Sequence, residues 1–172
     1  MSRTTVLLTE DMKRFVNAQR LGHVATVCPD GTPNLSPKGT TLVWDDDTLV
    51  FADLRSPQTV ENLLDNPAIE INVIDPVLRK GFRFKGTATV LREGPSFESV
   101  VRFYEQTSGL SRQRIRAVVL AAVSRVLPLV SPAYDSGRDE ESVRRQWIQH
   151  YLELWGLPGL WIAEGGSEAA DH

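Results

Sequence analysis

Four polar residues recur at every second position in one short segment of the sequence. Asn34, Ser36, Lys38 and Thr40 alternate with other residues in the run NLSPKGT. Alternate residues of a β-strand share a face, so this spacing predicts a polar stripe along one strand. A polar stripe is unusual on a strand of a barrel, so this segment is a candidate functional site. A solvent-exposed face at a sheet edge would give the same pattern, and the segment alone leaves both interpretations open.

A second candidate site follows the strand-like run that ends in Phe51, Ala52 and Asp53. The next residues, Ser56 and Pro57, are typical of a helix start, because serine is a preferred N-cap and proline is preferred at the first helical position. The free amides and positive dipole end of a helix start can hold a phosphate. Ordinary N-capping by Ser56 explains the same residues without a ligand.

Motifs for several other chemistries are absent from the sequence. It contains no glycine-rich dinucleotide fingerprint, no P-loop, no nucleophile elbow and no metalloprotease motif. His23, His150 and His172 are far apart along the chain, and Cys28 is the single cysteine. We therefore expect no metal site, no internal disulfide and no catalytic triad, and the sequence identifies no catalytic residue.

Composition restricts the partners and the compartment. The net charge of -3, from 19 basic and 22 acidic residues, provides no general attraction for nucleic acid or an anionic membrane. A chain of 172 residues suits one domain, which we predict over residues 1–164, with residues 165–172 as a disordered tail. The start of the chain lacks a signal-peptide pattern, and no apolar run reaches the ~20 residues that a membrane span needs. These features favour a soluble, cytoplasmic protein.

The elements that position the polar residues follow from hydrophobic periodicity and turn residues. Helices are predicted at residues 10–20, from residue 56 to 65, from residue 94 onward, and at 140–155. Strands are predicted at residues 23–28, 34–44, 48–52, 68–74, 81–91 and 115–130. The last strand is ambiguous by pattern, and its β-branched content and Pro128 favour a strand over a helix. Six strands without regular βαβ alternation predict an α+β domain built on an antiparallel barrel.

The order of these segments resembles a known family. The runs NLSPKG, VFAD, SPQT, NLLDNPAI and RFKGTA follow one another between residues 34 and 88. Together they are similar to the FMN-binding split barrel of the pyridoxamine 5'-phosphate oxidase family, over most of residues 10–132. The resemblance implies a six-stranded antiparallel split β-barrel with peripheral helices, bound FMN and a homodimer.

The resemblance also implies which residues contact the cofactor, in four groups. The isoalloxazine ring would lie along Leu35, Ser36, Pro37, Lys38 and Gly39. The flavin or its ribityl chain would contact Phe51, Ala52 and Asp53, and the phosphate would be held by Ser56, Gln58 and Thr59. Lys80, Gly81, Phe82 and Arg83 would approach the cofactor across the dimer interface. The family often has a basic residue just after the position of Ser56, where this chain has Pro57 and Gln58.

The function implied is an FMN-dependent oxidoreductase that transfers hydride between the flavin and a small molecule. A cation at Lys38 near the ring would raise the reduction potential of the flavin, although a lysine that only solvates the strand fits equally well. The substrate stays open, because the substrate-binding histidine and arginine pattern of true pyridoxamine 5'-phosphate oxidases has no match in residues 156–172.

Two alternative functions stay open at this point. One is an F420-binding split-barrel reductase, in which Lys80, Arg83 and Lys85 would line a groove for the longer tail of the deazaflavin. The other is a non-catalytic flavin-binding protein. Trp147, Tyr151 and Trp155 fall on one stripe of the last helix, which predicts either a dimer surface or packing within the chain.

Overall fold

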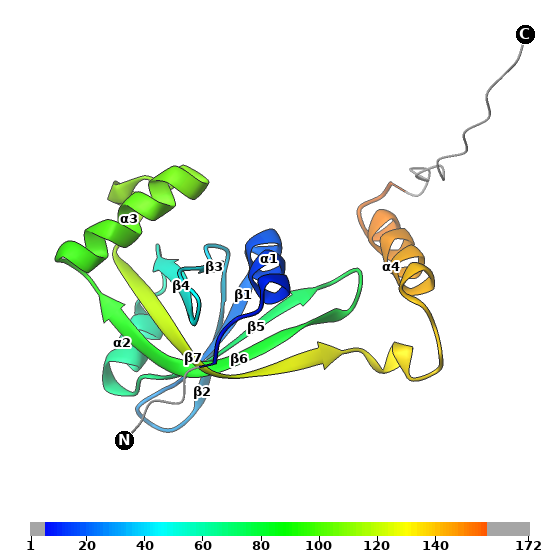
Figure 1. The fold of residues 1–172 in the computed structure, drawn as a ribbon, viewed down its shortest axis with the longest axis horizontal. Helices are drawn as coiled ribbons and strands as arrows, with labels where there is room; N and C mark the ends of the chain where they lie inside the picture. Colours follow the sequence, from blue (N-terminus) through cyan, green and yellow to red (C-terminus); the bar gives the residue numbers. More distant parts are fainter. Residues whose placement is uncertain (1–5, 158–172) are drawn as a thin grey trace, which may run out of the picture. The chain divides into compact units, whose positions relative to one another are not determined.

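The computed structural model describes residues 6–157 and confirms an α+β split barrel (Figure 1). Its curled sheet has the strand order β2-β1-β5-β6-β7-β4-β3, and every neighbouring pair is antiparallel. The strands are β1 (Gly22–Val27), β2 (Pro33–Lys38), β3 (Leu42–Val43), β4 (Thr48–Asp53), β5 (Ala68–Asp75), β6 (Lys80–Leu91) and β7 (Ala117–Val130).

The described chain forms two compact units. The first contains residues 6–75 and 80–130, and the second contains residues 76–79 and 131–157. Both units fall within the predicted domain of residues 1–164, which stays a prediction. The predicted tail at residues 165–172 lies outside the described residues.

The sheet has seven strands where six were predicted. The single strand expected at residues 34–44 is two strands, because the chain turns after Lys38. The Thr41 hydroxyl donates to the Lys38 carbonyl at 2.8 Å, and the Tyr104 hydroxyl donates to the Thr40 carbonyl at 2.7 Å. Thr40 therefore lies in a turn instead of continuing the polar stripe of β2.

The helices occupy the segments predicted for them. They are α1 (Glu10–Gln19), α2 (Pro57–Asp65), α3 (Pro95–Ser108) and α4 (Glu140–Leu154), with short 3-10 turns η1 (Arg112–Arg114) and η2 (Pro132–Tyr134). Thr9 caps α1 by accepting a hydrogen bond from the Met12 amide, and Gly109 ends α3 in the left-handed conformation. Residues 115–130 form a strand, as their β-branched content predicted.

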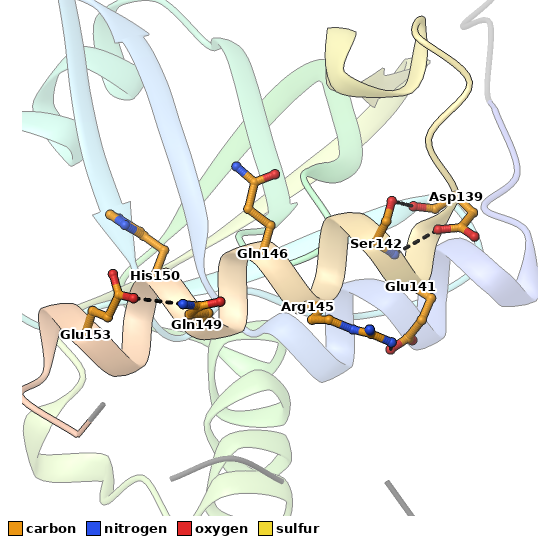
Figure 2. Close-up of a pocket in the computed structure, with 8 residues that line it drawn as sticks. All are labelled: Asp139, Glu141, Ser142, Arg145, Gln146, Gln149, His150 and Glu153. Atoms are coloured by element: carbon orange, nitrogen blue, oxygen red, sulfur yellow. Dashed lines mark hydrogen bonds and ion pairs between the residues drawn. The ribbon is translucent and has the colours of Figure 1, made fainter. Parts of the chain in front are cut away.

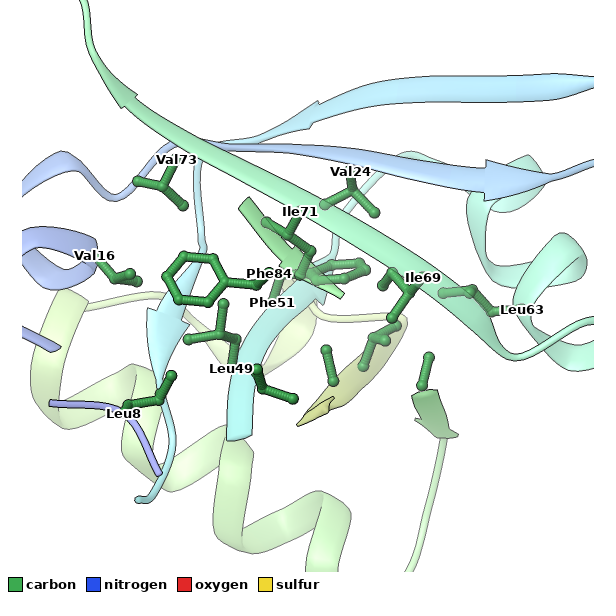
Figure 3. Close-up of a cluster of buried hydrophobic side chains, with 14 residues drawn as sticks. Leu8, Val16, Val24, Leu49, Phe51, Leu63, Ile69, Ile71, Val73 and Phe84 are labelled. Atoms are coloured by element: carbon green, nitrogen blue, oxygen red, sulfur yellow. The ribbon is translucent and has the colours of Figure 1, made fainter. Parts of the chain in front are cut away.

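The inner face of the sheet buries one continuous core, in which side chains from β1, β4, β5 and β6 converge (Figure 3). Phe51 and Phe84 are its largest members from the strands, and Leu63 of α2 and Val16 of α1 pack against them. A second cluster lies between α3 and the other face of β4 and β7, so β4 is buried on both faces. Neither of these two clusters includes a helix that packs on the outer faces of β1, β2 and β5.

The second unit is organised around α4. Arg79 stacks over the Trp147 ring at 4.1 Å from the centroid, and the Tyr134 hydroxyl donates to the Leu78 carbonyl at 2.7 Å. The predicted aromatic stripe exists, because the Tyr151 and Trp155 rings stack with centroids 5.6 Å apart. Within residues 6–157, no helix combines the length and the apolar character that a membrane crossing requires.

Candidate functional site

Strand β2 turns its polar residues inward and its apolar residues outward. Its register with β1 places Ser36 opposite Val24 and Lys38 opposite Gly22, and Val24 belongs to the buried core. Lys38 is only 4 % exposed, whereas Leu35 on the other face is 68 % exposed. The predicted polar stripe therefore faces the inside of the barrel. Strand β2 lies at the edge of the sheet, but its polar face is not solvent-exposed at Lys38.

The buried ammonium group of Lys38 is held by two hydroxyl groups. Its Nζ donates to Ser36 Oγ at 2.7 Å and to Thr59 Oγ1 at 3.2 Å, and it lies 5.9 Å from the ring centroid of Phe51. Burial lowers the pKa of Lys38, and the negative charge of Asp53 opposes that shift. Within residues 6–157, no carboxylate forms an ion pair with this ammonium group, so its charge is only partly compensated.

A hydrogen-bond network connects this lysine to helix α2. Asn34 Nδ2 donates to Thr26 Oγ1 at 3.1 Å and to Thr59 Oγ1 at 3.5 Å. Asn62 Nδ2 donates to the same Thr26 oxygen at 3.0 Å, and Gln58 Nε2 donates to Asn62 Oδ1 at 2.8 Å. The network orients β1, β2 and the first turns of α2 against one another. Thr26, Thr59 and Asn62 are almost fully buried, so it is a built internal site instead of a solvated surface.

The start of α2 offers hydrogen-bond donors toward this network. Ser56 occupies the N-cap position, but its side chain makes no capping hydrogen bond. The prediction that the Ser56 hydroxyl caps the helix is therefore wrong. Its backbone N–H donates instead to Asp53 Oδ1 at 2.6 Å, which fastens the end of β4 to the start of the helix. The Ser56 hydroxyl therefore accepts no hydrogen bond from the first-turn amides of Gln58 and Thr59.

This group of residues combines a buried ammonium group with hydroxyl groups and a helix start. It contains an ammonium group, three hydroxyl groups and the positive end of a helix dipole, but Asp53 is its one buried carboxylate within residues 6–157. A phosphate would be attracted by the ammonium charge and could accept hydrogen bonds from amides at the helix start. We call Ser36, Lys38, Ser56 and Thr59 the donor cluster.

Other predicted contact residues lie apart from the donor cluster. Leu35 and Pro37 lie on the outer face of β2, and Gly39 is exposed in the turn that follows. Phe51 is a core residue, and the Ala52 amide donates to Thr40 Oγ1 at 3.0 Å. The predicted contact residues of β2 therefore lie on opposite faces of the strand. Their side chains cannot all contact the same side of one ligand.

The predicted group at the start of β6 is mostly structural. Phe82 points toward the core, where its ring meets Phe15 edge-on at 5.4 Å. A Cβ on Gly81 would lie 2.1 Å from the Val73 carbonyl oxygen, so glycine is required there by the approach of β5. Lys80 pairs with Val130 at the far end of the sheet. Arg83 lies on the outer face.

Arg83 is already engaged in an ion-pair group on that face. Its Nε lies 3.0 Å from Glu70 Oε1, and Lys85 Nζ lies 3.0 Å from Glu70 Oε2. In the same cross-strand row as Arg83, Asn72 Oδ1 and His23 Nδ1 are buried without a hydrogen-bond partner among the described residues. Such atoms cost about 1–3 kcal/mol each when left unpaired.

Sequence reasoning did not assign Thr26 or Asn62 to the site. Asn62 is fully buried on the apolar face of α2, between Val60 and Leu63, and also donates to Cys28 Sγ at 3.5 Å. An asparagine at an apolar position of a helix is an unusual choice, because asparagine is a poor helix former. That was the available signal, but its partner across the barrel cannot be deduced from spacing.

A separate shallow pocket lies along α4 (Figure 2). Its lining residues come from that helix and its cap, and none is a predicted site residue. Several are paired with each other: Gln149 Nε2 donates to Glu153 Oε1 at 3.0 Å, and Asp139 Oδ1 accepts from the Ser142 amide at 2.8 Å. Some of its polar groups are therefore already bonded to each other, and the pocket contains none of the predicted cofactor-binding residues.

Comparisons with known proteins agree with the fold. Residues 8–129 match the family model described as pyridoxamine 5'-phosphate oxidase. The solved structure of HupZ from Group A Streptococcus is 35 % identical, with a TM-score of 0.64, over 73 % of this chain and 96 % of HupZ. Curated protein sequences give no match.

Two more distant structures share the fold. An FMN-binding protein from Syntrophomonas wolfei is 19 % identical with a TM-score of 0.57, over 71 % of this chain and 86 % of that protein. An F420 reductase is 22 % identical with a TM-score of 0.55, over 70 % of this chain and 98 % of the reductase.

Proposed function

Because the chain belongs to the pyridoxamine 5'-phosphate oxidase family, we propose that it binds flavin mononucleotide and acts as an FMN-dependent oxidoreductase on a small molecule. The family and its structural relatives connect the chain to flavin-type cofactors. Bound FMN would supply hydride-transfer chemistry, and the protein would supply binding, orientation and the charges near it.

The observation that carries this proposal is a helix start without a side-chain cap, next to a buried ammonium group that no described carboxylate pairs. Ser56 and Thr59, both predicted phosphate ligands, lie at the N-terminus of a nine-residue helix. Lys38 adds a buried positive charge that no described carboxylate pairs. A terminal phosphate on the cofactor matches this donor set, because helix N-termini and ammonium groups both favour phosphate.

We also propose that the protein works as a homodimer. The outer face of the sheet exposes Leu35, Pro37 and Ile74. A strand face that stays in water usually carries polar residues at such positions. The unpaired His23 and Asn72 atoms lie on the same face, and contact with a second copy could reorganise that row and give them partners. Light scattering on the flavin-loaded protein tests this, and a loaded monomer at micromolar concentration would exclude a shared cofactor site.

F420 is the second candidate cofactor. The long tail of F420 calls for free basic residues, and the expected groove residues Arg83 and Lys85 are both paired with Glu70. This pairing favours FMN over F420. The two cofactors differ in their visible spectra, because bound FMN gives a yellow protein with two bands and F420 absorbs in one band near the violet.

The experiment that tests the cofactor is release and identification. Heating the purified protein should release FMN, which mass spectrometry distinguishes from FAD and F420. Recovery of FAD, or no flavin even after incubation with excess FMN, would overturn the assignment. Catalysis is tested separately by adding NADH or NADPH to the FMN-loaded protein without oxygen. Bleaching of the visible bands supports an oxidoreductase, whereas no bleaching with either donor favours the non-catalytic alternative.

A further inference from the structure

We propose that Lys38 is the residue that selects for the terminal phosphate of the cofactor, in place of the basic residue that relatives often carry after the helix start. This inference rests on the proposed FMN function, and it moves Lys38 from the flavin ring to the phosphate end of the site. It predicts that the chain distinguishes phosphorylated from unphosphorylated flavin mainly through one lysine.

The contacts of Lys38 support the phosphate end. Its Nζ bonds Thr59 Oγ1 at 3.2 Å, and Thr59 lies in the first turn of α2. An ammonium group beside the positive end of a helix dipole is in an unfavourable field unless an anion lies between them. The second partner, Ser36 Oγ at 2.7 Å, is also neutral, so the only compensation among the described residues is the charge of Asp53, which acts on the ammonium group without forming an ion pair.

The local sequence leaves a place for this lysine. Pro57 and Gln58 are both uncharged, so neither supplies a cation to a phosphate, and the Gln58 side-chain amide already donates to Asn62 at 2.8 Å. Arg55 is exposed to solvent, where its charge is well screened. Among residues 6–157, Lys38 is the only lysine or arginine that is buried. A charge in such an environment acts strongly on a bound anion.

The position of Lys38 is also enforced. Asn34 shares Thr59 Oγ1 with the lysine, and Asn34 is held by Thr26 on the neighbouring strand. These bonds keep Thr59 and the ammonium group in one geometry before a ligand arrives. Preorganised donors of this kind increase affinity because less order must be imposed on binding.

The test compares two ligands that differ only in the phosphate. FMN and riboflavin are titrated into apoprotein of the parent, Lys38→Met and the control Lys13→Met, with flavin fluorescence as the readout. Lys13→Met removes the same charge from α1, where Lys13 pairs with Asp46 and Glu10. Lys38→Met should weaken FMN binding by roughly tenfold to a hundredfold, because a hydrogen bond to a charged group carries that much affinity. Riboflavin affinity should change less than threefold, and the control should leave both unchanged.

A second measurement separates phosphate binding from tuning of the ring. The reduction potential of the flavin bound to Lys38→Met, measured at saturating FMN, should match the parent. Equal losses of FMN and riboflavin affinity, or a lowered potential with unchanged FMN affinity, would overturn the proposal and return Lys38 to the ring. If Lys38→Met does not fold, Lys38→Gln replaces it, since it keeps a polar group beside Ser36 and Thr59 but removes the charge, and it should weaken FMN but not riboflavin.

Inorganic phosphate makes the result independent of FMN. Millimolar phosphate should raise the melting temperature of the parent apoprotein and of Lys13→Met, but not that of Lys38→Met. If the parent responds to phosphate through Lys38 but binds no FMN, the proposed cofactor is wrong and the phosphate site stands. If the parent responds to neither phosphate nor FMN, both proposals fail.

Discussion

Replacing Gly81 with alanine tests whether this glycine serves the sheet or the cofactor. The added Cβ would lie 2.1 Å from the Val73 carbonyl oxygen and 2.9 Å from the Ile74 Cα, both in the backbone of β5. Real Cβ atoms essentially never approach other heavy atoms below 3.0 Å. Neither obstacle is a side chain that can rotate away, so β5 and β6 must separate.

The magnitude follows from that separation. The distance to the carbonyl oxygen must increase from 2.1 to at least 3.0 Å, which strains the ladder where Ile74 pairs with Gly81. Overpacking costs about 1–3 kcal/mol, and a weakened backbone hydrogen bond adds about 1 kcal/mol. A total of about 2–4 kcal/mol corresponds to a melting temperature lower by roughly 5–15 °C for a chain of this size.

Thermal unfolding of the apoprotein, followed by circular dichroism, measures the effect. Gly39→Ala is the matched control, because a Cβ at that turn position meets no atom within 4 Å. It should change the melting temperature by less than about 2 °C. If Gly81→Ala melts with the parent, the close approach of β5 does not constrain this position. Loss of FMN binding in such a stable variant would then assign Gly81 to the cofactor.

Three further predictions concern single side chains. Ser56→Ala should leave the melting temperature of the apoprotein within about 1 °C of the parent, since Ser56 makes no capping bond, but should weaken FMN binding roughly tenfold in a fluorescence titration; equal FMN affinity would exclude a phosphate contact. Lys38→Met should raise the melting temperature of the apoprotein, because it removes a buried ammonium group that no described carboxylate pairs; a gain of about 1 kcal/mol would correspond to about 2–4 °C. Burial lowers the pKa of Lys38 from 10.5, so the unfolded chain binds this proton more tightly than the folded chain. The free energy of unfolding of the parent should therefore increase as the pH rises from the lowered pKa toward 10.5. Lys38→Met should lack this increase. The Ser142 backbone N–H lowers the pKa of Asp139 below 3.8, so this cap of α4 is fully present above that value and is lost as the pH falls through the lowered pKa. Helical circular dichroism should fall over that range in the parent but not in Asp139→Asn, which keeps a capping oxygen without the charge; identical curves would show that Asp139 ionisation does not support the helix.

Local sequence signals were sufficient for most of the elements. Pro57 and Pro95 each begin a helix, as the preference of proline for the first turn predicts. Apolar residues at every second position identified β5, because a strand buried on one face must alternate. The tyrosine and tryptophan stripe of α4 followed from helical spacing. These signals depend on interactions within a few residues of each other, so a single sequence contains them.

The sequence by itself also determined the family and the order of the polar segments, because the spacing of short motifs survives without knowledge of their contacts. Only the tertiary structure decided which face of β2 is inside. The two-residue repeat of a strand places Leu35 and Lys38 on opposite faces, but it does not say which face is buried. Pairing with β1 placed the lysine inside the barrel. The same holds for Asn62 and Gly81, whose roles depend on atoms of distant strands. Burial and backbone approach are properties of the packed chain, and no local pattern encodes them.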